Sequence, residues 1–262
     1  IIVGFQDEKV KNLFEELLES LSYTGVGGKK STGLGRFEYQ ESEISTNLEK
    51  KLQKHIDLLM KRYPVLEACK EEIIGGYELM EECYKNGGKL LIAGNGGSAA
   101  DSEHIAGELM KRFKIPRSIP EDLKKKLIEI DSVRGENLSK NLERPLMAIP
   151  LVAHEALTTA YINDVDGLGV FAQQLYGFGR AGDVFLGITT SGNSQNVMSA
   201  TVVARALGIK VLGLTGENGG ELSQVANVCV KVPETETYMV QELHLPVYHC
   251  WCLMLEDKFF GK

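Results

Sequence analysis

Two short loops in this chain combine glycine, asparagine and hydroxyl side chains in a way that suits a phosphate group. The first reads Gly-Asn-Gly-Gly-Ser over residues 94–98, and the second reads Thr-Thr-Ser-Gly-Asn-Ser over residues 189–194. Each loop stands between a short apolar run and a helical pattern, so its hydroxyls lie beside the first amides of a helix and donate to an anion without adding net charge. Such residues also cap helices without any ligand. Two loops of this kind nevertheless favour a ligand.

Neither loop matches a nucleotide-binding motif. The dinucleotide fingerprint requires G-x-G-x-x-G and a later acidic residue, and the P-loop requires a Lys followed by Ser or Thr. The glycine-rich stretch at residues 25–35 also fails the P-loop pattern, because Lys29 is followed by Lys30. We therefore expect no nucleotide cofactor.

Acid–base or metal chemistry could come from two helical segments. His104 and Glu108 are four residues apart, which places them on one helix face, and Gln241 and His249 are eight apart on the last helical pattern. A His and a Glu at this spacing more often form a surface pair. Two polar clusters on otherwise apolar helices favour a shared ligand or metal.

Alternating strand and helix patterns position these groups. Short apolar runs occur at residues 89–93, 147–150, 183–188, 210–214 and 226–232. Helical periodicity occurs at residues 44–61, 65–84, 99–113, 195–207 and 238–259. This alternation predicts an α/β fold with an open parallel sheet covered by helices on both faces. In such sheets ligands bind beyond the carboxyl ends of the strands, where both loops stand.

Two segments fall outside this pattern. Residues 1–45 contain one amphipathic stretch and the glycine run, and they are predicted to be an N-terminal segment ahead of a main domain over residues 46–262. The sequence does not fix the origin of this segment, and a gene fusion or a remnant would both explain it. Residues 114–144 are charged and contain Pro116 and Pro120, which predicts an exposed insertion with a helix over residues 121–130.

Composition narrows the classes of partner. The formal net charge of −7 provides no field that attracts nucleic acid or anionic lipid. Five cysteines without C-x-x-C spacing indicate reduced core residues. The chain shows neither a signal-peptide pattern nor an apolar run long enough to span a bilayer. We expect a cytoplasmic protein that binds neither membrane nor nucleic acid.

The motifs together resemble one known family. Residues 93–109 read AGNGGSAADSEHIAGEL, which resembles the signature of the phosphoheptose isomerases of the sugar isomerase (SIS) fold. Residues 187–194, GITTSGNS, resemble the phosphate loop of that family. Residues 162–164, 214–220 and 241–249 follow the family pattern in the same order. The resemblance implies an aldose–ketose isomerase that acts on a sugar phosphate, sedoheptulose 7-phosphate, through an enediol.

The resemblance also implies a role for each matching residue. Glu108 would serve as the base at carbon and His249 as the acid at oxygen. Zinc would be bound by His104, Glu108, Gln241 and His249, as in some members. Members assemble as homotetramers with sites built from adjacent subunits. The sugar phosphate would be held by the two loops and two further residues: Asn95, Gly96, Gly97, Ser98, Asp164, Thr189, Thr190, Ser191, Ser194 and Gln241.

The chain departs from the family pattern in two places, and its N-terminal segment resembles a different family. Tyr238 stands where members often have an Asp, and the insertion at residues 114–144 is longer than usual. Residues 1–39 resemble instead the glycine-rich C-terminal part of CRISPR-associated RAMP proteins, but so short a piece cannot bury a core of its own.

Two other classes of function compete with the enzyme. A non-catalytic SIS protein, either a sugar-phosphate-sensing regulator or a partner in replication initiation, would keep the phosphate loop, but such relatives tend to lose the catalytic pair that is present here as Glu108 and His249. An RNA-binding protein led by residues 25–37 conflicts with the acidic charge of the chain. The sequence favours the enzyme.

Overall fold

Five apolar runs form one parallel sheet in the computed structural model, which describes residues 49–261. The strands are β1 (Leu90–Gly94), β2 (Ala148–Pro150), β3 (Val184–Ile188), β4 (Lys210–Thr215) and β5 (Val228–Lys231), in the spatial order β2-β1-β3-β4-β5. The predicted parallel sheet and all five of its strands are thereby confirmed. The segment predicted at residues 1–45 lies outside the described residues.

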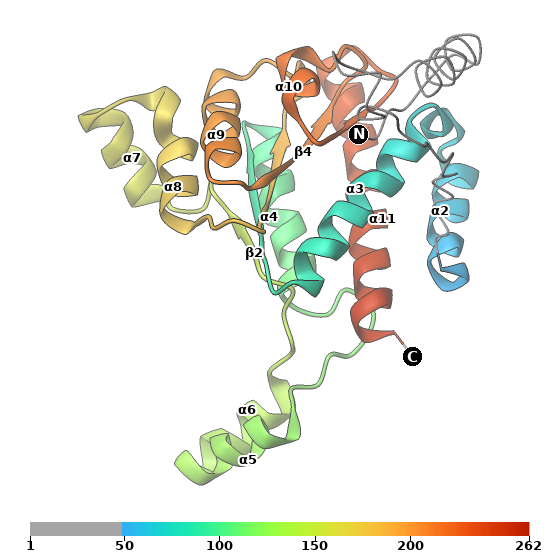
Figure 1. Ribbon diagram of the computed structural model, residues 1–262. Helices are drawn as coiled ribbons and strands as arrows, with labels where there is room; N and C mark the ends of the chain where they lie inside the picture. The colour runs from blue at the N-terminus through green and yellow to red at the C-terminus, as the bar shows by residue number, and fades with distance from the viewer. Residues whose placement is uncertain (1–48, 262) are drawn as a thin grey trace, which may run out of the picture. The chain divides into compact units, whose positions relative to one another are not determined.

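Helices cover both faces of this sheet (Figure 1). On β1, Leu90 and Ile92 point into one core cluster, while Leu91 and Ala93 point into the other. The first cluster is covered by α2 (Lys50–Arg62), α3 (Lys70–Lys85), α4 (Gly97–Met110) and α11 (Thr237–Phe260). The second is covered mainly by α8 (Val170–Phe178), α9 (Gln195–Ala206) and α10 (Gly220–Val225). Burial of both faces explains why the strands read as continuous apolar runs.

The helix predicted over residues 65–84 begins differently. A 3-10 helix, η2 (Pro64–Cys69), precedes α3. Pro64 occupies the first position of η2, where its missing N–H removes no helical hydrogen bond. A second proline, Pro246, lies inside α11, which nevertheless continues as one helix of 24 residues.

The sequence patterns did not predict four helices and a 3-10 turn. These are α6 (Ser132–Asn141), α7 (Glu155–Asp164), η3 (Gly167–Gly169), α8 and α10. Helix α7 has no buried residue, and Gly135 is the only buried residue of α6. A helix without a buried apolar stripe carries no periodic hydrophobic signal, which explains two of these omissions.

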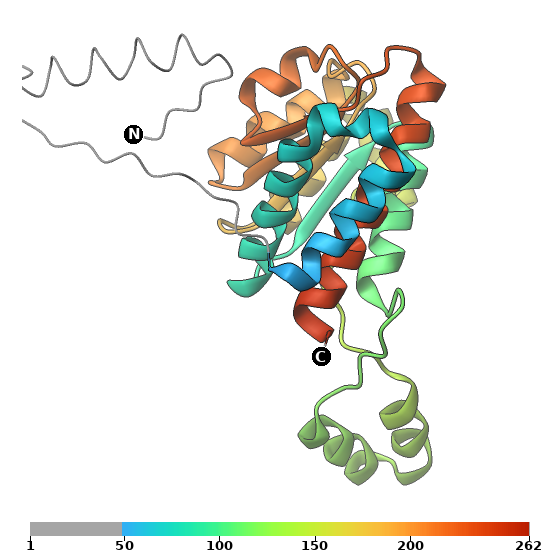
Figure 2. The same cartoon turned by 90° about the vertical axis from the view of Figure 1, so that its right-hand side faces the viewer.

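The insertion forms a helical hairpin of α5 (Glu121–Ile130) and α6, and α5 occupies the predicted residues. The two helices contact each other and stand apart from the sheet (Figures 1 and 2). At its base, Ser118 pairs with Glu143 in an isolated antiparallel bridge. The Arg144 N–H donates to the Arg117 carbonyl at 2.8 Å. Both ends of the hairpin are therefore fixed to each other. Within residues 49–261, no helix has the length and apolar character needed to cross a membrane.

Candidate active site

The two predicted phosphate-binding loops lie side by side at one edge of the sheet. Strands β1 and β3 are parallel neighbours, and Gly94 pairs in register with Ile188, so both chains leave the sheet at the same edge. The amides of Asn95 and Asn196 exchange two hydrogen bonds of 2.9 Å, which tie the first loop to the first turn of α9. The sequence analysis included Asn95 and missed Asn196.

The second loop gathers hydroxyl groups instead of using them as helix caps. The Thr189 and Ser194 hydroxyls are 2.8 Å apart, and Ser191 Oγ accepts from the Asn193 N–H at 3.2 Å. Ser194 occupies the cap position of α9 but makes no side-chain cap hydrogen bond. The capping explanation therefore does not account for Ser194. Together with Thr190, these hydroxyls form the loop that the sequence predicts for a phosphate.

Gly192 allows the second loop to turn tightly. Its φ is 70°, in the left-handed region, and a Cβ at this position would collide with the Gly219 carbonyl. The Leu222 N–H also donates to the Gly192 carbonyl at 3.0 Å. A larger residue at position 192 would therefore displace the loop from the start of α10.

The first loop enters α4 through Gly96 and Gly97. Gly96 is the N-cap of α4, with a φ of 55°. A Cβ on Gly97 would lie 2.7 Å from Gln241 Nε2, so this glycine lets α11 approach the start of α4. Ser98 follows in the first turn and is only 2% exposed. Of the predicted contacts in this loop, Asn95, Gly96 and Gly97 are exposed and Ser98 is buried.

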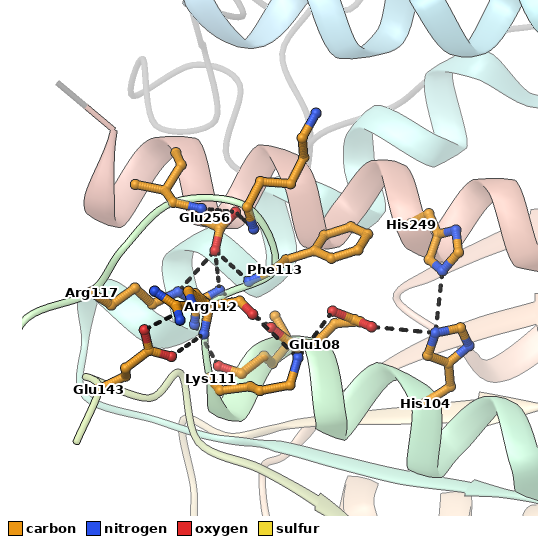
Figure 3. Close-up of polar contacts among 12 residues, drawn as sticks. His104, Glu108, Lys111, Arg112, Phe113, Arg117, Glu143, His249 and Glu256 are labelled. Atoms are coloured by element: carbon orange, nitrogen blue, oxygen red, sulfur yellow. Dashed lines mark hydrogen bonds and ion pairs between the residues drawn. The ribbon is translucent and has the colours of Figure 1, made fainter. Parts of the chain in front are cut away.

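His104, Glu108 and His249 come together where α4 and α11 run side by side (Figure 3). His104 Nε2 lies 3.4 Å from Glu108 Oε1 and 3.4 Å from His249 Nε2. We call these three residues the His–Glu–His cluster. Burial lowers the pKa of His249, and the nearby His104 adds to this effect while Glu108 opposes it. His249 is therefore neutral over a wider pH range than a free histidine.

The far end of α4 is fixed by a buried ion pair that the sequence analysis missed. Arg117 donates to the carbonyls of Leu109 at 2.7 Å and Glu108 at 3.2 Å. Its guanidinium also contacts Glu256 Oε1 at 2.9 Å, and both side chains are almost fully buried (Figure 3). The available signal was Glu256, a carboxylate that directly follows the apolar run of residues 250–255 on the last helix.

Glu256 also organises the chain that leaves α4. Its carboxylate accepts from the backbone N–H groups of Phe113 and Lys114 at 2.7 Å and of Ile115 at 3.1 Å. These three donors and the guanidinium satisfy the buried charge. The segment after Glu108 is thus attached directly to α11.

Two further residues missed by the sequence analysis, Asp101 and Tyr248, contact the cluster from behind. The buried Tyr248 hydroxyl lies 3.0 Å from His104 Nδ1 and donates to Asp101 Oδ1 at 3.1 Å. The sequence signal for these two residues was their position, because Asp101 precedes His104 by one helical turn and Tyr248 is adjacent to His249.

Gln241 and Asp164 lie outside the cluster. Gln241 packs against Gly97, at the start of α4. Asp164 is the exposed last residue of α7 and accepts from the Asn163 side chain at 2.8 Å. Within the described chain α7 packs mainly on η3 and α8, whereas the cluster lies on α4 and α11.

The donor types of the cluster suit zinc, which binds imidazole nitrogen and carboxylate oxygen. The two separations of 3.4 Å are close to the ~3.3 Å expected between ligands of a tetrahedral ion with bonds of ~2.0–2.1 Å. Among residues 49–261, however, no three His, Cys, Asp or Glu side chains form a ready-made metal site. Binding would require Glu108, His249 and Gln241 to turn toward a common point beside His104.

Comparison with known proteins places the chain in a family. The SIS domain family model matches residues 53–144 and 133–216. The phosphoheptose isomerase of Akkermansia muciniphila is 38% identical over 178 residues, covering 68% of this chain and 80% of that protein. That of Trichlorobacter lovleyi is 37% identical over 215 residues, covering 82% of this chain and 94% of the relative.

Solved structures agree. The phosphoheptose isomerase GmhA of Neisseria gonorrhoeae superposes with a TM-score of 0.60 at 30% identity, over 80% of this chain and 99% of that one. A phosphoheptose isomerase of Francisella tularensis gives a TM-score of 0.62 at 29% identity, over 79% of this chain and 97% of that one. The chain therefore belongs to the SIS domain family and, within it, to the phosphoheptose isomerases.

Proposed function

We propose that this chain is an aldose–ketose isomerase that converts sedoheptulose 7-phosphate into D-glycero-D-manno-heptose 7-phosphate. The observation that carries the proposal is the His–Glu–His cluster: His104 and Glu108 lie on α4, which begins at the first phosphate-binding loop, and His249 joins them from α11. The names of the relatives support the substrate class.

The spacing of the two sites suits a long sugar phosphate. His104 lies seven residues after Gly97, which corresponds to ~10 Å along the axis of α4. A seven-carbon sugar has six carbon–carbon bonds. Two extended residues of a protein chain have the same number of backbone bonds and span ~7 Å, so the carbon chain of the sugar has about this length before its phosphate is added. A phosphate held at the loops can therefore leave the first two carbons near His104, whose Nε2 lies 3.4 Å from Glu108 Oε1.

The reaction moves two protons in each half, one at carbon and one at oxygen. Glu108 takes the proton from C1 of the ketose while His249 donates a proton to the oxygen on C2, which gives the enediol. Glu108 then returns its proton to C2, and His249 takes the proton of the C1 hydroxyl as the aldehyde forms, which restores both residues to their starting states. The number of protons on the sugar is unchanged, as isomerisation requires.

We also propose that the loops hold the phosphate through Ser98, Thr189, Ser191 and Ser194, and that Asn95, Thr190 and Asp164 contact the sugar hydroxyls. The gathered hydroxyls of residues 189–194 support the first assignment. Asp164 lies on α7, which packs mainly on η3 and α8 rather than on the helices that carry the cluster, and this supports a site completed by a second subunit of a homotetramer.

Zinc remains a proposal on the same residues. His104, Glu108, Gln241 and His249 would hold it, and the ion would polarise the sugar oxygens as a Lewis acid. A carboxylate bound to zinc is a poorer base, so the metal role competes with the proton-transfer role of Glu108. Turnover that survives a chelator would favour the proton-transfer role, and turnover restored only by zinc would favour the metal.

We place the activity in the cytoplasm. All five cysteines of the chain lie within residues 49–261, and none is in a disulfide there. Free buried cysteines are typical of proteins from a reducing compartment.

The direct test is incubation of the full chain with a panel of ketose phosphates, with aldose formation followed by NMR. We expect conversion of sedoheptulose 7-phosphate and weaker conversion of shorter ketose phosphates. Binding of these sugars without formation of any aldose would contradict the proposal and would favour a sugar-phosphate sensor.

A further inference from the structure

Tyr248 connects the half-buried carboxylate of Asp101 to the His–Glu–His cluster. Its hydroxyl lies 3.1 Å from Asp101 Oδ1 and 3.0 Å from His104 Nδ1. Asp101 and His104 lie three residues apart on α4, while Tyr248 reaches both from α11 and is 1% exposed. The three groups form a hydrogen-bonded chain that ends on the side of the imidazole facing away from Glu108 and His249.

The number of available protons determines which group donates each of these two hydrogen bonds. A carboxylate can only accept, so the single hydroxyl proton of Tyr248 is donated to Asp101. The Tyr248 oxygen must then accept from His104, and His104 Nδ1 must carry a proton. A phenol keeps its proton at neutral pH, so this donor is always present.

A neutral imidazole protonated at Nδ1 has a bare Nε2. In His104 this is the nitrogen that lies 3.4 Å from both Glu108 Oε1 and His249 Nε2 (Figure 3). In the opposite tautomer an N–H would point into the cluster. The bare nitrogen can accept a hydrogen bond from His249, and it is equally suited to bind a cation.

We propose that Asp101 and Tyr248 are positioning residues that hold His104 in the Nδ1–H tautomer, with its bare Nε2 directed at Glu108 and His249. Neither residue touches the reacting atoms. The statement about the tautomer stands on the geometry alone, and only its consequence for turnover rests on the proposed isomerase function.

The test reads the tautomer directly. The full chain is labelled with 15N-histidine, freed of metal with a chelator and studied by NMR at a pH where its histidines are neutral. The chain has five histidines, and the signals of His104 are assigned as those that disappear in the His104→Gln variant. We expect a protonated Nδ1 and an unprotonated Nε2 in the wild-type protein.

Two variants should change this result in different ways. Tyr248→Phe removes the acceptor, so His104 should lose its preference and gain the Nε2–H form. Asp101→Leu leaves Tyr248 without an acceptor, so its hydroxyl should turn and donate to His104 Nδ1, which selects Nε2–H. The matched control is Tyr77→Phe, because Tyr77 is also buried and its hydroxyl has no hydrogen-bond partner in the described residues.

Turnover gives an independent reading. Tyr248→Phe and Asp101→Leu should each lower kcat about 10- to 100-fold, the usual effect of removing an outer partner of a site histidine, while Tyr77→Phe stays near wild type. An Nε2–H tautomer in the wild-type protein, or an unchanged tautomer in both variants, would overturn the proposal. Altered tautomers with unchanged turnover would overturn its catalytic part. If the wild type isomerises no ketose phosphate, the proposed function fails while the tautomer result still stands.

Discussion

Glu108 is the residue on which the proposed proton transfer depends most directly. It is the only carboxylate that the described structure places within 3.4 Å of His104 Nε2, and its backbone carbonyl is held by Arg117. Its side chain is partly buried, so it can meet a substrate without being fully exposed to water.

We expect Glu108→Gln to lower kcat by roughly 100- to 10,000-fold, because the amide keeps the shape of the side chain but cannot accept a proton from carbon. Binding of the sugar phosphate, measured by calorimetry, should change little. Glu103→Gln is the matched control, since Glu103 is exposed on the same helix. Turnover of Glu108→Gln within a few-fold of wild type would remove Glu108 from its role as base.

His249 and the hydroxyl loop should give different kinetic signatures. His249→Asn removes a group that acts only as protons move, so kcat and kcat/KM should fall together. Ser191→Ala removes a hydrogen-bond donor to the phosphate in both ground and transition states, so it should mainly raise KM. The rise should correspond to a loss of roughly 0.5–3 kcal/mol in binding free energy. If His249→Asn raises KM alone, His249 binds the substrate or supports a metal, and a chelator assay separates these two roles.

At the scale of elements, the contact of α4 with α11 decides where the cluster forms. The two helices run in the same direction, since Gly97 meets Gln241 near their starts and the connection after α4 meets Glu256 near the end of α11. The ion pair of Arg117 with Glu256 closes this contact beyond the cluster.

We therefore expect Glu256→Gln to reduce both stability and turnover. The variant leaves the buried Arg117 charge without a carboxylate, which costs about 3–5 kcal/mol in the free energy of unfolding. It should also loosen the carbonyl end of α4 and lower kcat. Chemical denaturation at a fixed protein concentration measures the first effect, with the exposed Glu129→Gln as control. A loss below about 1 kcal/mol would show that the pair does not hold this end of α4.

The sequence predicted the elements with strong local signals. Apolar runs gave the five strands, and the glycine loops gave the carboxyl edge of the sheet. Helices α6 and α7 were missed because they bury almost nothing. Among site residues, spacing identified His104 and Glu108, and family resemblance added the role of His249. Asp101, Tyr248 and Arg117 were missed, because the contacts of Asp101 with Tyr248 and of Arg117 with Glu256 join positions 147 and 139 residues apart and leave no periodic pattern.

At the scale of the whole molecule, one copy leaves apolar surface uncovered. Exposed apolar side chains gather on α7, η3, α8 and the turn between them, although α7 buries no residue within the described chain. They are Leu157, Ile162, Val165, Leu168 and Tyr176. Patches of this kind often mark interfaces between subunits.

We expect a homotetramer by light scattering. If Asp164 completes the site of a neighbouring subunit, mixed tetramers of Asp164→Asn and Glu108→Gln chains should regain activity that neither variant has alone. Some sites in such a mixture combine the intact Glu108 of one chain with the intact Asp164 of another. A stable, active monomer would contradict the assembly, and mixed tetramers without regained activity would place Asp164 outside the shared site.

The base of the α5–α6 hairpin has a consequence for how this chain can vary. The bridge between Ser118 and Glu143 and the hydrogen bond from Arg144 to Arg117 bring the two ends of the hairpin together before its helices begin. Because the ends already meet, the length and sequence between them can change at little cost in loop entropy and without moving α4. The segment between residues 118 and 143 can therefore be shortened, extended or replaced by another folded segment without changing the site beside Glu108.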